Sequence, residues 1–112
     1  MSIQLEEKTF AFNGKTYVLR ANMSVLDRIQ EDFDGDINKL MAKSINNASA
    51  LILAEMLNDY AEEQGWEEHW TEKRVKTYAS MPMLHELDIS GMFFRSITPI
   101  NTKEQKPENS GN

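Results

Sequence analysis

The sequence feature that most constrains the fold is the pair Asn13-Gly14, which lies between two short apolar segments. An Asn-Gly pair favours a two-residue type I′ turn, because both central residues of that turn need positive φ angles. A loop of this length places Phe10 opposite Tyr17 and Phe12 opposite Lys15 in an antiparallel hairpin. One face then holds the large apolar side chains, which are Phe10, Phe12, Tyr17 and Leu19. Since an isolated hairpin is marginal in water, we expect this face to pack on the helices that follow.

Helical periodicity and turn residues predict the helices after the hairpin. The first is expected to begin near Ser24, which with Asp27 resembles a capping box, and to end at the Asp34-Gly35 turn. Asp36 is expected to cap a short second helix. The inner face of this second helix is predicted to consist of Ile37, Leu40, Met41 and Ile45.

The third predicted helix forms the centre of the fold. It begins at Asn46-Asn47, is apolar nearly all round from Ala50 to Leu57, and ends at Gly65. A helix of this kind is buried on several sides. The chain is therefore predicted to be an α+β protein, with an N-terminal β-hairpin packed on a small bundle of about four to five helices.

Two further helical segments complete the bundle. Thr71 is expected to cap one of them, with Val75, Tyr78 and Ala79 facing inward. The last segment starts at Ser80-Met81-Pro82, since proline is tolerated in a first turn, and Gly91 is a candidate kink within it. We expect this segment to end at Thr98-Pro99.

The 112 residues suffice for one modest core, which we assign to a single domain over residues 1–98. Residues 101–112 contain no large apolar side chain. Such a segment cannot bury enough surface to offset the entropy of ordering it. A disordered C-terminal tail is therefore predicted over residues 99–112.

Composition disfavours several classes of protein. The net charge is −6, and an acidic surface repels phosphates, so we expect no nucleic-acid partner. The most apolar window, residues 48–57, is interrupted by Glu55 and is too short to span a bilayer, so no membrane association is expected. The N-terminus shows no basic-then-apolar secretory signal, and the absence of cysteine excludes disulfides and thiolate chemistry.

Candidate chemical sites in the sequence do not complete a known motif. The acidic run Asp32, Asp34 and Asp36 suggests a calcium loop, but neither register supplies both the glycine and the final glutamate. His69 and His85 are the only histidines, whereas a catalytic metal site usually has three protein ligands. No nucleophile elbow or phosphate loop is present. We therefore expect no enzymatic activity, no metal and no cofactor.

The aromatic residues of the C-terminal half are the remaining candidates for function. Aromatic side chains are enriched at interface hot spots, but they also anchor small cores, and the core interpretation is favoured for most of them. Seven methionines agree weakly with an interface, since methionine adapts to varied partners. The candidate partner-binding residues are Trp66, Trp70, Phe93 and Phe94.

The order of these segments resembles the tail assembly chaperones of long-tailed bacteriophages and their relatives in prophages and gene transfer agents. The resemblance rests on the hairpin segment 12–20, the helix segment 25–30 and the Asp34-Gly35 break, and covers about residues 8–97. In that family a Gly–Lys/Arg–x–Tyr–x–Leu–Arg strand precedes a helix, a glycine turn and an apolar helix. One departure is Gln30, where relatives often have glutamate, although Glu31 lies beside it.

The resemblance implies a non-enzymatic role in the host cytoplasm, and absence from the mature virion. Such chaperones coat the aggregation-prone tape measure protein before tail assembly and help to recruit tail tube subunits. An acidic domain with adaptable apolar surface suits this role physically. Repeated weak binding along an extended client also favours modest self-association.

Other functions remain open at this point. One is a structural virion component, such as a tail tube or head–tail joining subunit, although tube subunits are usually richer in strands. Another is a small regulatory protein that binds a cellular partner. An enzyme with an unrecognised site is the least favoured interpretation.

Overall fold

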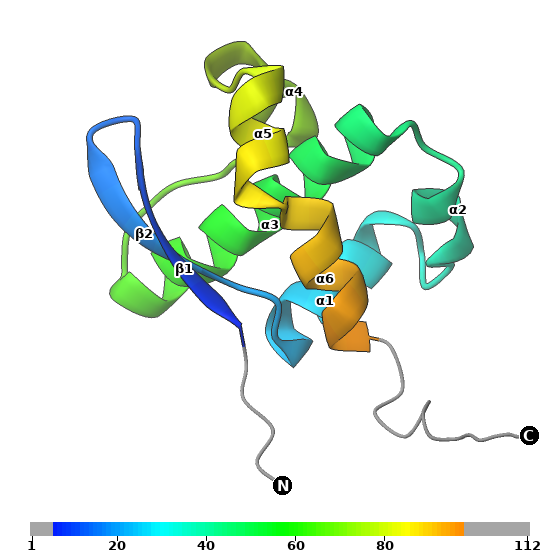
Figure 1. The fold of residues 1–112 in the computed structure, drawn as a ribbon. Coiled ribbons are helices and arrows are strands. Elements are labelled where there is room, and N and C mark those ends of the chain that lie inside the picture. Colours follow the sequence, from blue (N-terminus) through cyan, green and yellow to red (C-terminus); the bar gives the residue numbers. More distant parts are fainter. Residues whose placement is uncertain (1–5, 98–112) are drawn as a thin grey trace, which may run out of the picture.

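The computed structural model describes residues 6–97, which form an N-terminal hairpin followed by a small helical bundle (Figure 1). The α+β fold is the one that the sequence predicts. The predicted tail, residues 99–112, lies outside the described residues. The elements are β1 (Glu7–Phe12), β2 (Lys15–Arg20), α1 (Met23–Asp32), α2 (Asn38–Met41), α3 (Ile45–Gln64), α4 (Glu72–Tyr78), α5 (Met81–Leu87) and α6 (Ile89–Ile97).

The hairpin has the predicted register, in which Phe10 pairs with Tyr17 and Phe12 with Lys15. Asn13 and Gly14 have φ angles of 52° and 81°, so the turn uses the left-handed region that this residue pair favours. The predicted apolar face is buried, and the rings of Phe10 and Phe12 stack with their centroids 5.1 Å apart. This face packs on the helices, because β2 lies along α3 (Figure 1).

Helix α3 runs through the centre of the molecule, and α1, α4, α5 and α6 all pack against it (Figure 1). The Ser44 side chain accepts a hydrogen bond from the backbone N–H of Asn47 at its start. Gly65, with φ of 78°, forms the left-handed cap at its end, as predicted. Burial on several sides explains why this helix is apolar nearly all round.

Helix α1 begins differently from the prediction. Asn22, not Ser24, is the N-cap, and its side-chain oxygen accepts a hydrogen bond of 2.9 Å from the N–H of Val25. The hydroxyl of Ser24 instead hydrogen-bonds to Asp59 on α3. A contact between residues 35 positions apart therefore replaces the predicted local capping box.

The C-terminal segment forms two helices, and the break lies at Asp88, whose φ is 54°, rather than at Gly91. A Cβ atom at Gly91 would collide with the Asp88 side chain, so the glycine provides space inside α6. The hydroxyls of Ser49 and Ser90 lie 2.6 Å apart and join α3 to α6. Two further predictions are confirmed, namely Thr71 as the cap of α4 and a helix start at Ser80-Met81-Pro82, where Ser80 is the N-cap of α5.

Candidate functional site

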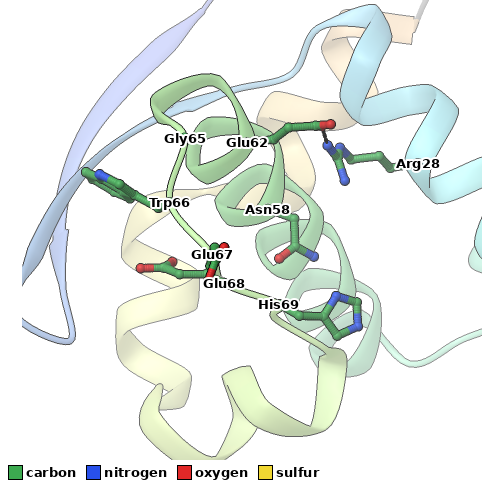
Figure 2. Close-up of a pocket in the computed structure, with 8 residues that line it drawn as sticks. All are labelled: Arg28, Asn58, Glu62, Gly65, Trp66, Glu67, Glu68 and His69. Atoms are coloured by element: carbon green, nitrogen blue, oxygen red, sulfur yellow. Dashed lines mark hydrogen bonds and ion pairs between the residues drawn. The ribbon is translucent and has the colours of Figure 1, made fainter.

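The most distinctive region is a groove of about 410 Å³ at the C-terminal end of α3 (Figure 2). One side is formed by the segment between α3 and α4, residues 65–71, which we call the connecting segment. Trp66 and His69 point to opposite sides of this segment (Figure 2). The groove is lined by Arg28, Asn58, Glu62, Gly65, Trp66, Glu67, Glu68 and His69.

Asn58 fixes the connecting segment to α3. Its amide nitrogen donates to the carbonyl oxygen of Trp70 at 2.8 Å, and its amide oxygen accepts from the N–H of Trp70 at 2.6 Å. The same amide nitrogen donates to Oε1 of Glu55 at 3.1 Å. Asn58 and Trp70 are both buried, so these bonds satisfy polar groups that water cannot reach.

Glu68 joins the connecting segment to the hairpin. Its carboxylate accepts hydrogen bonds from the hydroxyl of Tyr17 at 2.8 Å and from Nε1 of Trp70 at 3.0 Å, and forms an ion pair with Lys15. Burial opposes ionisation of Glu68, but these donors hold the pKa of its carboxyl below the ordinary value. Burial and the Glu68 carboxylate together raise the pKa of Tyr17 to about 12.

Trp66 belongs to an aromatic cluster between the hairpin and α3. Its ring lies edge-on to Tyr17 and Tyr60, with centroid distances of 5.6 and 5.8 Å. The ammonium of Lys15 lies 4.7 Å from the Trp66 ring centroid, at a distance that allows a cation–π interaction. Trp66 is half-buried, so part of this cluster is open to solvent.

The four aromatic residues predicted to bind a partner have different environments. Trp70 and Phe93 are core residues, exposed by only 1% and 0%, and no partner can contact them while the fold stays closed. Trp66 and Phe94 are half-buried and pack against the core. For these two residues partner binding stays a prediction.

Sequence reasoning missed the apolar residues that are most exposed. Met41, Ile45 and Tyr78 were expected to face inward, but all three lie mainly in solvent. Helix α2 has a single turn, and Leu40 is its one buried residue. The large apolar side chains exposed in the described part of the chain are Met23, Met41, Ile45, Tyr78, Met81 and Ile97.

Three charged residues that line the groove, Arg28, Glu62 and Glu68, form ion pairs. Arg28 forms ion pairs with Glu62 and Asp59, which link α1 to α3. Figure 2 shows the pair with Glu62. Within residues 6–97, no three histidine, cysteine or acidic side chains come together in a way that could hold a metal ion. No helix in this range is long and apolar enough to cross a membrane.

Comparisons of this chain with protein-family models, curated proteins and solved structures find no match. The functional argument therefore depends on the residues and their arrangement.

Proposed function

We propose that this protein is a phage tail assembly chaperone, which binds the tape measure protein, keeps it soluble and helps to recruit tail tube subunits. It would act in the host cytoplasm and be absent from the mature virion. The resemblance of residues 8–97 to that family suggests the role. The observation that supports it best is the set of methionine and isoleucine side chains exposed on the helices.

Exposed methionines suit a client with many similar apolar sites. Met23, Met41 and Met81 are 71%, 63% and 51% exposed. The methionine side chain is flexible and polarisable, so it fits apolar surfaces of varied shape. Contiguous exposed apolar surface marks binding sites, and we propose that these methionines contribute to such a surface.

Part of this exposed set lies on segments that contact each other. Met41 and Ile45 flank the turn between α2 and α3, and Met81 follows α4. The α2–α3 turn contacts α4 through the ion pair of Lys43 with Glu72. A hydrogen bond of 2.7 Å from Lys76 to the Asn47 side chain adds a second contact. Met41 and Ile45 therefore flank a turn that is joined to α4, and both are candidates for contact with a client helix.

Co-expression with the cognate tape measure protein tests the proposal. Expressed alone, that client should be largely insoluble, since its long apolar helices expose more surface than a soluble chain tolerates. Co-expression with this protein should transfer it to the soluble fraction. The triple variant Met23→Ser, Met41→Ser and Met81→Ser should lose most of this rescue.

A matched control separates the apolar surface from general surface change. Lys39→Ser, Lys73→Ser and Glu86→Ser also alter three exposed helical residues, one each on α2, α4 and α5. This control should keep full rescue, and both triple variants should melt close to the parent protein. Equal rescue by both variants would show that the exposed methionines do not bind the client.

A further inference from the structure

The hairpin is a two-stranded sheet, so each of its strands has one edge that the other strand does not cover. β2 lies along α3 (Figure 1), whereas β1 has no comparable contact with any described helix. Within residues 6–97, no backbone group outside the hairpin forms a hydrogen bond with the backbone of β1. An unpaired strand edge is a template for pairing with another chain. The outer edge of β1 is therefore a candidate interaction surface.

The Asn-Gly turn determines which groups of β1 point to this edge. In a hairpin with a two-residue loop, the residues that flank the turn form a hydrogen-bonded pair, and such pairs alternate with non-hydrogen-bonded pairs along the strands. The residues that flank the turn are Phe12 and Lys15. The backbone N–H and C=O groups of Glu7, Thr9 and Ala11 therefore point away from β2. The side chains of these three residues are exposed.

β1 lacks the features that usually protect an edge strand. Such strands commonly carry a proline, a β-bulge or charged side chains over the edge. β1 contains no proline, and it pairs with β2 from Glu7 to Phe12 without a bulge. Its two charged side chains are engaged elsewhere, since Glu7 forms an ion pair with Arg20 on β2. The ammonium of Lys8 donates a hydrogen bond to the carbonyl oxygen of Leu87 on α5.

We propose that β1 pairs antiparallel with β1 of a second copy of this chain, so that the two hairpins join into one continuous sheet. With a two-fold axis at Thr9, this residue lies opposite Thr9 of the second copy, and Glu7 lies opposite Ala11. Each of these residues then forms both of its outward backbone hydrogen bonds across the contact. Opposed threonines stabilise a sheet, and no like charges lie directly opposite each other. The contact involves no client, so it is independent of the proposed chaperone function.

The sequence of β1 favours this register over the neighbouring ones. An axis at Lys8 would place the two Lys8 side chains opposite each other, and opposed like charges destabilise a sheet. An axis at Phe10 would place Glu7 opposite Asn13, which lies in the turn, so the outward groups of Glu7 would gain no strand partner. The axis at Thr9 avoids both costs. Because β1 complements a copy of itself in this way, a second copy is the partner that fits the edge.

Amide hydrogen exchange tests the contact in the parent protein. The N–H groups of Thr9 and Ala11 should exchange slowly in concentrated solution and faster after dilution. When nine-tenths of the chain is dimeric, exchange that occurs only from the monomer slows about tenfold. The N–H of Thr16 points outward from β2, on the opposite edge, and should exchange at the same rate at both concentrations. Protection of Thr9 that does not depend on concentration would place another segment of the same chain on this edge, and would overturn the proposal.

Proline variants test the same contact by light scattering after size-exclusion chromatography. Proline is tolerated in an edge strand where the lost N–H does not serve the sheet, so Thr9→Pro should keep the hairpin but remain monomeric. The matched control is Thr16→Pro, which replaces an exposed threonine with an outward N–H on the other strand and should dimerise like the parent protein. Circular dichroism checks that both variants fold, and the exchange experiment decides the question if either does not. Equal dimer fractions in the two folded variants, or a parent protein that is monomeric at every concentration, would overturn the proposal.

Discussion

Replacing Asn58 with leucine tests how strongly the connecting segment is fixed to α3. Leucine has a similar size but cannot form the two hydrogen bonds to the Trp70 backbone or the bond to Glu55. Three hydrogen bonds contribute about 1 kcal/mol each, and a buried N–H or C=O left without a partner costs about 1–3 kcal/mol. The polar groups left without Asn58 can regain part of their hydrogen bonding when the structure relaxes. We therefore expect the free energy of unfolding to fall by about 3–5 kcal/mol. This is a large share of the 5–15 kcal/mol that is typical of a domain (about 0.05–0.15 kcal/mol per residue).

Urea denaturation, followed by tryptophan fluorescence and far-UV circular dichroism, measures this loss. With an m-value of about 2 kcal/mol/M, the midpoint should fall by about 1.5–2.5 M. Asn46→Leu is the matched control, because Asn46 is an exposed asparagine on the same helix and should change stability by about 0.5 kcal/mol or less. If Asn58→Leu costs less than about 1 kcal/mol, the hydrogen bonds to Trp70 do not hold the segment.

Two other predictions concern the hairpin. Gly14→Val should lower the free energy of unfolding by about 1 kcal/mol or more, since valine resists the φ of 81° at this position; an unchanged thermal midpoint would contradict the turn assignment. In a spectrophotometric titration, one tyrosine should ionise near pH 12, and Tyr17→Phe should remove that step. The stabilising contribution of the Tyr17 proton should be complete below pH about 10, the pKa of an unfolded tyrosine, and lost as pH rises through about 12. A Tyr17→Phe variant with the same alkaline unfolding profile as the parent protein would refute this.

Local signals account for what the sequence predicts well. These are the Asn13-Gly14 turn, the cap residue Thr71, the helix start at Ser80-Met81-Pro82 and the Gly65 stop, each of which depends on a few neighbouring residues. These signals, with the apolar pattern of α3, suffice for the α+β fold. The break between α5 and α6 was predicted at Gly91 but lies at Asp88. Aspartate can adopt the left-handed conformation, but it does so too rarely for its presence in the sequence to indicate a break.

The candidate site depends on contacts that no local pattern reveals. Glu68 meets Lys15 across 53 residues of sequence, and Ser24 meets Asp59 across 35. The burial of each aromatic residue also depends on such long-range contacts. The sequence therefore could not show that Trp70 is buried whereas Trp66 is partly exposed. The exposure of Met41 likewise follows from the short length of α2, a single turn in which Leu40 is the one buried residue.

The most direct test of the proposed function is the mass of the complex that this protein forms with the purified cognate tape measure protein. The two proteins, refolded together, should be separated by size-exclusion chromatography with light scattering. The account predicts a soluble complex that contains one tape measure chain and several copies of this protein. Separate elution of the two proteins at every mixing ratio, or an aggregated client, would contradict the chaperone function.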